Sequence, residues 1–410
     1  MDIRVILDSG AHSWYNTVFA SAVNAGAYVR KTASYDMVKS PEFKKYLDDY
    51  IAFIYKYKDV IWQYINLDVV FNAEASWETQ KYMESCGLHP IPVIHFGEDT
   101  KWLKKYLDDY DYIGIGGLGQ GIGPASFIKS MGDPVFKMIC GTKNLMPRAK
   151  THGFAVTAPG LIFRYPWYSV DSTSFLKAAG FGIVMVPQWV PEKGWDFLRT
   201  TYHYVSTRFV ITNTHQRAWV VGDTLDDLRR NPKGISLLRY VEEKGMCLGE
   251  SKFHVEKADY ILQENESVAS ELSNGLQQIE TVVVPGITND GMLRLRYNIL
   301  FALDLVRATP KFPRPFKPVA QSFDFGEDNS NSIDAPYFDS ENINFCFARL
   351  FNRIKHDDPV LDMFGDKLAT LETYFNYHEK TTNVGWERIC DFIRKHREAE
   401  SVKQKEQVAL

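Results

Sequence analysis

The first 180 residues alternate between short apolar runs and longer stretches with apolar residues at helical spacing. A helix is predicted over 41–58, where a proline precedes apolar positions at that spacing: Phe43, Tyr46, Leu47, Tyr50, Ile51 and Ile54. Similar patterns predict helices at 73–86, ended by Gly87, at 98–110 and, with mixed character, at 124–150. Apolar runs predict strands at 3–8, 61–68, 92–95, 111–115, 152–156 and 167–171.

Regular alternation of strands and helices is typical of parallel strands joined by right-handed crossovers. Six strand–helix units within about 175 residues favour a (β/α)₈ barrel, the TIM barrel, over an open sheet. The predicted fold class is therefore α/β.

The alternation breaks after residue 182. Strands are predicted at 181–190, 202–212 and 217–221, and a helix at 225–244; we interpret these as later barrel units with an insertion at about 182–280. An amphipathic helix over 292–306 would close the barrel, and four prolines within 309–318 end that domain. The barrel is thus predicted over 1–318, a polar and acidic linker over 319–339, a helical extension over 340–396 and a flexible tail over 397–410.

Composition narrows the class of protein. The 410 residues are 45% hydrophobic and 14% aromatic, which predicts a sizeable core. A net charge of −4 argues against indiscriminate nucleic-acid binding but leaves room for a local basic groove. The five cysteines are scattered without a Cys-x-x-Cys pair, which predicts no zinc site and reduced thiols in a cytoplasmic protein. No apolar run reaches about 18 residues, so no membrane partner is expected.

Polar residues and glycines follow the predicted strands: Asp8, Asp68, His95, Gly116–Gly117 and Asp171. A barrel would gather these residues around one mouth. Taken singly, an aspartate after a strand is often only a helix cap or turn former, and a histidine is often a hydrogen-bonded core residue. Asp8 precedes Ser9-Gly10, however, and Asp171 lies within an aromatic and hydroxyl-rich stretch, residues 165–175. We predict that Asp8 and Asp171 share one pocket as a catalytic pair.

The glycine-rich stretch 114–121 allows three interpretations. It fits the dinucleotide-binding pattern loosely and lacks the Lys-Ser/Thr of a P-loop. It could be a flexible turn. The interpretation we favour is that glycines at a strand end let backbone N–H and C=O groups reach a planar heterocycle.

With these stretches assembled, the chain resembles the tRNA-guanine transglycosylase superfamily, and within it the DpdA-type 7-deazaguanine DNA transglycosylases of phages and bacteria. Asp8-Ser9-Gly10-Ala11-His12-Ser13 stands where the tRNA enzymes carry Asp-Ser-Gly-Gly-Phe-Gln, and residues 116–121 resemble their Gly-Gly-Leu-Ala-Val-Gly-Glu. Asp171-Ser172 resembles the nucleophile segment. Residues 66–68, 93–97 and 293–298 resemble two base-binding strands and the closing helix. The likeness covers roughly residues 1–180 and 285–310.

The resemblance implies a base exchange in which Asp171 is the nucleophile and Asp8 the general acid and base. The remaining residues that it implies for base binding are Asp68, His95, Gly116, Gly117, Leu118, Ser9, Gly10, His12 and Phe154. The implied partners are DNA with a flipped or single-stranded guanosine, and a free 7-deazaguanine base such as preQ0. No cofactor or metal is implied, and a phage-borne copy would act in the host cytoplasm.

The chain departs from the tRNA enzymes in two ways, and three alternative functions stay open. His12 and Ser13 replace a phenylalanine and a glutamine, and the family's zinc module is absent from 182–280, which favours DNA over tRNA. A tRNA-directed enzyme, a non-catalytic barrel that binds nucleic acid or protein, and a sugar-processing barrel are the alternatives. The oligomeric state is open, with a homodimer among the options.

Overall fold

The structure is a computed structural model. It describes residues 4–11, 14, 38–70, 72–95, 97–117, 127–206, 232–257, 270–272, 276–316, 370–373, 386–387, 390–399 and 401–402. The chain divides into two compact units, the first formed by residues 1–172 and 311–410 and the second by residues 173–310. Every residue of the site described below that falls within these ranges belongs to the first unit.

Parallel strands form the centre of the first unit. They are β1 (Arg4–Leu7), β2 (Ile61–Tyr64), β3 (Val93–His95), β4 (Tyr112–Gly116), β5 (Lys150–Gly153), β6 (Ser169–Val170) and β12 (Thr370–Thr373). One sheet has the order β12-β1-β2 and another the order β3-β4-β5-β6. A parallel bridge between Ile65 and Ile91 links the two sheets just past β2 and just before β3.

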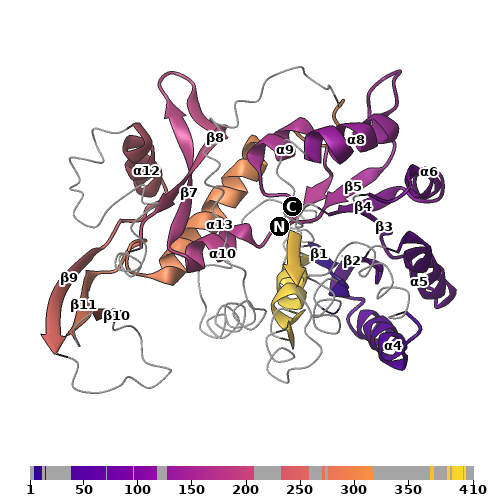
Figure 1. The fold of residues 1–410 in the computed structure, drawn as a ribbon, viewed down its shortest axis with the longest axis horizontal. Coiled ribbons are helices and arrows are strands. Elements are labelled where there is room, and N and C mark those ends of the chain that lie inside the picture. Colours follow the sequence, from indigo (N-terminus) through magenta and orange to yellow (C-terminus); the bar gives the residue numbers. More distant parts are fainter. Residues whose placement is uncertain are drawn as a thin grey trace. The chain divides into compact units, whose positions relative to one another are not determined.

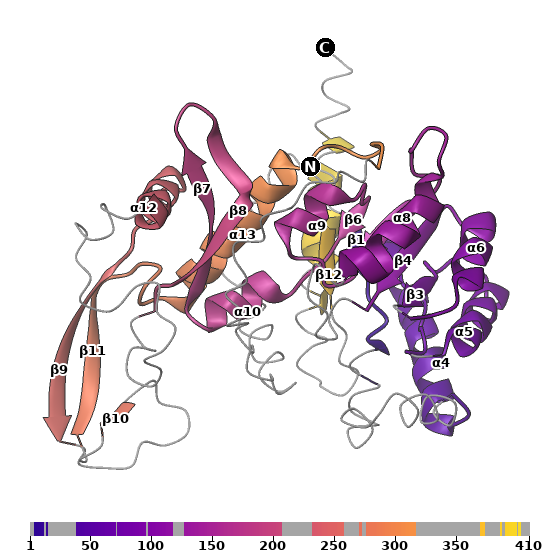
Figure 2. The ribbon, with the colours of Figure 1, turned by 45° about the horizontal axis from the view of Figure 1, so that its top comes forward.

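From β1 to β6, each strand therefore lies beside the next one in the sequence, and β12 lies on the other side of β1 (Figure 2). A doubly wound sheet would instead reverse its strand order at a switch point. The predicted α/β class with parallel strands is confirmed. Closure into an eight-stranded barrel stays a prediction.

Helices follow the strands. They are α4 (Pro41–Lys56), α5 (Ala73–Ser85), α6 (Thr100–Asp109), the π-helical turn η1 (Ile128–Gly132), α8 (Asp133–Cys140) and α9 (Pro159–Arg164). They lie at the predicted positions except for α9, which was not predicted. Helices α4, α5 and α6 lie along the outside of the strands (Figure 1). Their N-terminal amide groups are capped by side chains: Ser40 accepts from Phe43, Asn72 from Ala75, and Asp99 from Lys101.

Two apolar clusters lie on the two faces of the strands. Val5 and Leu7 of β1 pack with α4 and α5, whereas Ile6 packs with Ile65, Ile91, Val93 and Tyr112. Alternate residues of β1 thus enter different clusters, because successive side chains of a strand point to opposite faces. Both faces are buried, as parallel strands require.

The second unit contains two groups of antiparallel strands. It contains α10 (Ser174–Gly180), β7 (Ile183–Val190), β8 (Gly194–Tyr204), α12 (Pro232–Glu243), β9 (Glu250–Lys257), β10 (Ser270–Leu272), β11 (Leu276–Val284) and α13 (Gly291–Ala308). Strand β7 pairs antiparallel with β8, and β11 pairs antiparallel with β9 and β10. A short connection at 191–193 turns the chain back, so β7 and β8 form a hairpin. This hairpin falls within the insertion predicted at about 182–280, and the assignment of this region to later barrel units with an insertion stays a prediction. The strand predicted at 217–221 lies outside the described residues.

The predicted helix at 292–306 is present as α13, and buried polar side chains hold it. Asn298 accepts from the amide of Met185 at 3.1 Å and donates to the carbonyls of Phe175 and Ile183 at 3.0 Å each. Arg294 donates to the carbonyl of Ala179 at 3.0 Å. The helix is thereby tied to α10 and β7; its role in closing a barrel stays a prediction.

The C-terminal region differs from the predicted helical extension and tail. Residues 370–373 form strand β12, paired with β1, within the region 340–396 that was predicted as a helical extension. Helix is present at 386–387, 390–399 and 401–402, so it continues into the predicted tail. Trp386, Cys390 and Ile393 are buried in the same cluster as α4, and Arg394 pairs with Asp59 at 2.7 Å. The predicted linker, 319–339, lies outside the described residues.

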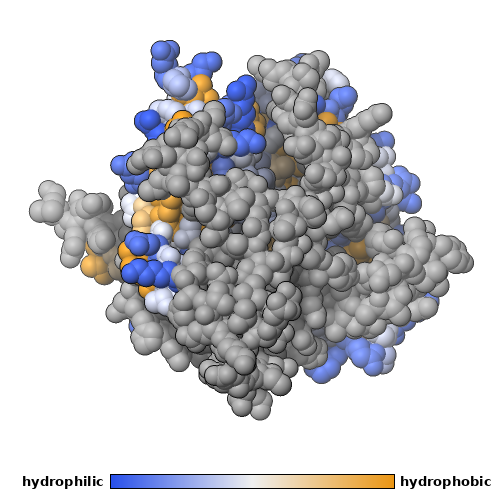
Figure 3. All heavy atoms as spheres, turned by 60° about the vertical axis from the view of Figure 1, so that its left-hand side comes forward, coloured by the Kyte–Doolittle hydropathy of each residue, from blue (hydrophilic) through white to orange (hydrophobic). Residues whose placement is uncertain are grey.

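Figure 3 shows one face of the molecule, on which the hydrophobic residues among the coloured atoms form small groups separated by hydrophilic ones. Within the described part of the chain, large apolar side chains that are more than 40% exposed include Leu198, Tyr202 and Val282–Val284. No helix in that part is both long and apolar enough to cross a membrane.

Candidate active site

The site lies where the parallel strands of the first unit end. Asp8 follows β1 and Asp171 follows β6 directly, while His95 and Gly116 are the last residues of β3 and β4. Asp68 follows β2 after three residues and lies 3.0 Å from His95. Because parallel strands share one carboxyl edge, residues up to 163 positions apart in the sequence share this edge.

Two tyrosines of α4 hold the chain just past the ends of β1 and β2. The hydroxyl of Tyr46 donates to the carbonyl of Ser9 at 2.8 Å, and that of Tyr50 donates to the carbonyl of Ile65 at 2.8 Å. Gly10 has a φ of 70°, a conformation that favours glycine, and lets the chain turn directly after Asp8. Ser9 is fully buried, and its own hydroxyl lies 3.4 Å from the amide of Ala11. Ser9 therefore supports the turn.

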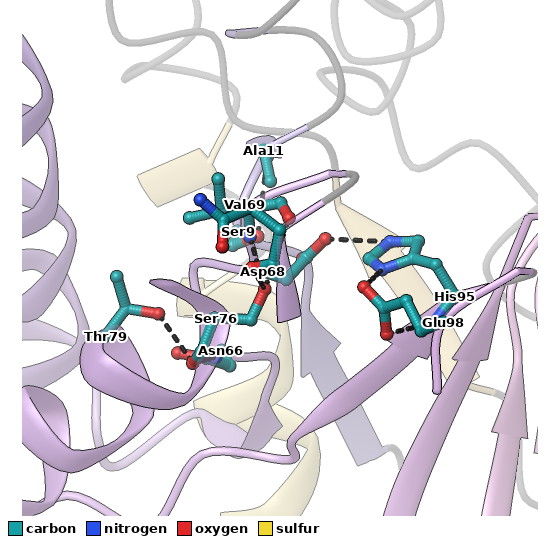
Figure 4. A network of polar contacts seen from close by, with 10 residues as sticks. Ser9, Ala11, Asn66, Asp68, Val69, Ser76, Thr79, His95 and Glu98 are labelled. Carbon is teal, nitrogen blue, oxygen red and sulfur yellow. Dashed lines mark hydrogen bonds and ion pairs between the residues drawn. The ribbon is translucent and has the colours of Figure 1, made fainter. Parts of the chain in front are cut away.

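The loop that carries Asp68 is fixed to the start of α5. Ser76 donates to the carbonyl of Asn72 at 3.1 Å and accepts from the amide of Val69 at 2.8 Å. Asn66 donates to the carbonyl of Ser76 at 2.8 Å. These bonds, shown in part in Figure 4, leave Asp68 little freedom and direct its carboxylate toward His95.

His95 lies between two carboxylates. Its Nε2 is 3.0 Å from Asp68 Oδ2, and its Nδ1 is 3.5 Å from Glu98 Oε1 on the opposite side (Figure 4). Glu98 also accepts from the backbone amide of His95 at 2.9 Å. Burial acts to lower the pKa of His95, but the two carboxylates outweigh it and raise this pKa to about 10. His95 is therefore an imidazolium cation at neutral pH.

Asp8 lies in an environment that disfavours its charged form. Burial, followed by the negative charges of Asp171 and Asp68, raises the pKa of Asp8 from 3.8 to about 7. The backbone amides of Ser9 and Gly10 act in the opposite direction and do not cancel this effect. At neutral pH the carboxyl of Asp8 is thus about half protonated, as a group that both donates and accepts a proton needs to be.

Asp171 is held by backbone groups of the neighbouring strand. Its amide donates to the carbonyl of Gly153 at 3.1 Å, and its Oδ1 accepts from the amide of Ala155 at 2.7 Å. Ala155 has a φ of 57°, an unfavourable conformation for a residue with a side chain, which costs about 1 kcal/mol. This strained residue aims its N–H at the carboxylate, and Oδ2 has no hydrogen bond within the described part of the chain.

A histidine lies beside Asp171 on β5. His152 Nε2 is 3.7 Å from Asp171 Oδ1, and the side chain of His152 is 1% exposed. Burial lowers the pKa of His152 despite the nearby carboxylate, so the ring is neutral at neutral pH. The site therefore contains one charged and one neutral histidine.

Glycines of β4 make room for the rings beside them. A Cβ on Gly116 would lie 2.8 Å from Cδ2 of His95, and one on Gly114 would lie 2.7 Å from Cε2 of Phe154. Phe154 is half-buried, and its ring meets that of His152 edge-on with centroids 4.6 Å apart. The glycine-rich stretch thus serves at least to admit two side chains of the site.

Most of the predicted site residues come together on this edge. The charges of Asp68 and Asp171 both act on Asp8, and His95 pairs with Asp68. Gly117 follows β4 with a φ of 106°. His12 and Leu118 lie outside the described residues, so their base-binding roles stay predictions.

Sequence reasoning missed Glu98, His152, Ser169 and Ala155. Glu98 follows His95 by three residues and had been assigned only to the start of a helix. His152 and Ser169 precede the strand ends rather than following them. Strand alternation could have revealed them. His152 lies two residues before Phe154 and Ser169 two residues before Asp171, so each pair shares one face of its strand.

A hollow of about 600 Å³ lies at the opposite, amino ends of β2 to β5. Its lining includes Trp62, Lys81, His89, Tyr110, Tyr112 and Lys150. It contains none of the carboxylates described above. Among the described residues, no group of three or more histidines, cysteines or acidic residues is arranged to hold a metal ion.

Comparisons with known proteins do not identify the chain. No protein-family model matches it, and no curated protein or solved structure matches it.

Proposed function

We propose that this protein is a DNA base-exchange transglycosylase, which replaces guanine with a 7-deazaguanine base through a covalent glycosyl-aspartate intermediate. One observation supports the proposal above the others. Asp8 and Asp171 lie on the same strand edge, and burial together with the charge of Asp171 helps raise the pKa of Asp8 to about 7. Two carboxyl groups in unlike environments can divide proton transfer from nucleophilic attack. The motif resemblance selects base exchange among the reactions that such a pair could perform.

In the first half of the reaction, Asp171 Oδ2 attacks C1′ of a deoxyguanosine. The C1′–N9 bond breaks, its electron pair leaves with the guanine, and Asp8 donates its proton to N9. The N–H of Ala155 already stabilises the negative charge on Oδ1, so Oδ2, which accepts no hydrogen bond from the described residues, is the more nucleophilic oxygen. The product is an ester between Asp171 and the sugar, with ionised Asp8 beside it.

In the second half, an incoming 7-deazaguanine loses its N9 proton to Asp8. N9 then attacks C1′, the ester bond breaks, and its electron pair returns to Asp171. Two inversions at C1′ give net retention, as in retaining glycosidases. Asp8 ends the cycle protonated, and its pKa near neutrality suits it to both proton transfers.

The two carboxylates on either side of His95, those of Asp68 and Glu98, support recognition of the donor edge of a guanine-like base. Among the described residues, the contacts of Asp68 use only Oδ2, which leaves Oδ1 to accept from the ring N–H and amino group of the base. The positive charge of His95 offsets the negative charge of Asp68, so Asp68 can lie close to Asp8 and Asp171. A neutral base presenting two donors would complete this arrangement.

The proposal is tested by offering labelled guanine and preQ0 to the protein with DNA and tRNA side by side. We expect incorporation into DNA, detected by nucleoside mass spectrometry. We also expect a covalent protein–DNA adduct when no incoming base is supplied. Transfer to tRNA alone would reassign the polymer, and the absence of both adduct and incorporation would overturn the proposal.

Asp171→Asn gives the sharpest control. The amide is nearly isosteric and cannot form the ester by attack of a carboxylate, so adduct and exchange should both disappear while the folded state persists. Asp108→Asn is the matched variant, because Asp108 is 70% exposed and lies at the other end of the first unit's strands; its activity should equal that of the wild type.

A further inference from the structure

A line of hydrogen-bonded groups runs from Asp171 along the strands toward their amino ends. His152 Nδ1 is 2.6 Å from the hydroxyl of Ser169, which is 2.6 Å from the hydroxyl of Tyr112. At the other end, His152 Nε2 faces Asp171 Oδ1 and has no hydrogen-bond partner within the described part of the chain. The line thus joins the candidate nucleophile to residues of three strands, β4, β5 and β6.

Only one direction of donation suits a carboxylate at the end of this line. If Ser169 donates to His152 Nδ1, then Tyr112 can donate to Ser169, and the single ring proton of the neutral histidine must be on Nε2. That N–H then faces Asp171. In the opposite direction, the lone pair of Nε2 would face a negatively charged oxygen, which is electrostatically unfavourable.

We propose that Tyr112 and Ser169 hold His152 in the tautomer that carries its proton on Nε2, and that this N–H positions and stabilises the carboxylate of Asp171. The separation of 3.7 Å is longer than a hydrogen bond. A movement of about half an ångström would bring the two atoms within the usual limit of ~3.2 Å. Catalytic contacts commonly shorten in this way when substrate binds.

The consequence for the reaction rests on the proposed function. When the ester bond breaks, negative charge returns to Asp171, and the Nε2–H joins the Ala155 amide in stabilising it. When the ester forms, the same donors slow the attack slightly, because they stabilise the free carboxylate. His152 should therefore favour discharge of the intermediate over its formation.

The tautomer can be measured without assuming any activity. In protein labelled with ¹⁵N-histidine, long-range ¹H–¹⁵N spectra distinguish a protonated Nε2 from a protonated Nδ1, and His152→Gln identifies the resonance. We expect wild type to show Nε2–H only. Ser169→Ala should give a mixture, and Ser169→Thr, which keeps the hydroxyl, should restore the wild-type pattern.

The catalytic part is measured by single-turnover kinetics on DNA. Ser169→Ala should slow discharge of the covalent adduct by about tenfold while changing its formation less than about twofold, because only a positioned donor is affected. Tyr112→Phe should act in the same direction. Tyr168→Phe is the matched control, since the ring of Tyr168 lies 5.3 Å from that of Tyr112 but Tyr168 does not belong to the line.

The outcomes separate the two proposals. A wild-type ring protonated on Nδ1, or a tautomer unaffected by Ser169→Ala, would overturn this inference even in an active enzyme. A changed tautomer with unchanged discharge would overturn the role of His152 in the reaction. If wild type forms no adduct with any DNA, the proposed function and the catalytic role both fail, and the spectra still decide whether the line fixes the tautomer.

Discussion

Replacing Asp8 with asparagine should make the protein more stable and inactive. Above a pH of about 7, folding requires an ionised Asp8 to lie in a buried site beside two other carboxylates. A pKa that rises from 3.8 to about 7 on folding corresponds to a cost of about 4 kcal/mol at high pH. Asparagine has no charge and avoids this cost. The amides of Ser9 and Gly10 donate more weakly to a neutral amide oxygen than to a carboxylate, and this difference reduces the gain in stability by about 1 kcal/mol.

The pH dependence identifies the cause. Below pH 3.8 Asp8 is protonated in both the folded and the unfolded chain, so its ionisation costs nothing. As the pH rises toward 7, only the unfolded chain gives up the proton, and the stability of wild type falls relative to Asp8→Asn. The variant should therefore be more stable than wild type by about 3 kcal/mol at pH 8 and by about 1 kcal/mol at pH 5.

Urea unfolding at the two pH values measures this difference. For a unit of this size, about 3 kcal/mol should move the midpoint by roughly 1 M. Asp108→Asn, at an exposed position, should show no comparable shift. A gain for Asp8→Asn that is equal at both pH values, or a loss at pH 8, would refute the reasoning, because it would mean that the folded state does not raise the pKa of Asp8.

Three further predictions concern the surroundings of the site. Glu98→Gln removes one carboxylate from His95; the pKa of His95, followed by NMR, should fall, and affinity for preQ0, measured by calorimetry, should weaken about tenfold. Gly116→Ala should displace the His95 ring and lower the free energy of unfolding by about 1–3 kcal/mol, whereas Gly180→Ala, which meets no neighbouring atom, should not. Trp386→Ala should cost about 3 kcal/mol in urea unfolding, because this side chain is 2% exposed; an unchanged midpoint would show that the C-terminal segment contributes little to the core.

The sequence was informative wherever a local pattern decides the structure. Helix α4 shows apolar spacing, a proline and a serine cap, and it is present within two residues of its predicted end. The carboxylates after the strands were visible for the same reason, since strand ends in a parallel sheet share an edge. Charge and proton state were not visible, because they depend on which groups become neighbours: His95 is charged and His152 is neutral, although both lie in the same four-stranded sheet.

Non-local pairing was the part that the sequence could not decide. Strand β12 pairs with β1 across more than 360 positions, and nothing within residues 370–373 specifies that partner. The direction in which β7 and β8 pair was likewise not visible, because a strand pattern shows its period and not its direction. Period alone does not distinguish a short reversal at 191–193 from a crossover.

The number of charges on the strand edge explains why one carboxyl group there must hold a proton. Asp8, Asp68, Asp171 and Glu98 supply four carboxyl groups, and His95 is the only imidazolium among the described residues beside them, since burial keeps His152 neutral. His95 lies between Asp68 and Glu98, so its positive charge mainly stabilises those two carboxylates. Asp171 accepts from the backbone amide of Ala155, whereas Asp8 is desolvated and has two anionic neighbours, Asp171 and Asp68. With a pKa raised to about 7, Asp8 is protonated in about half of the molecules at neutral pH, which suits the group that the proposed reaction needs as its acid.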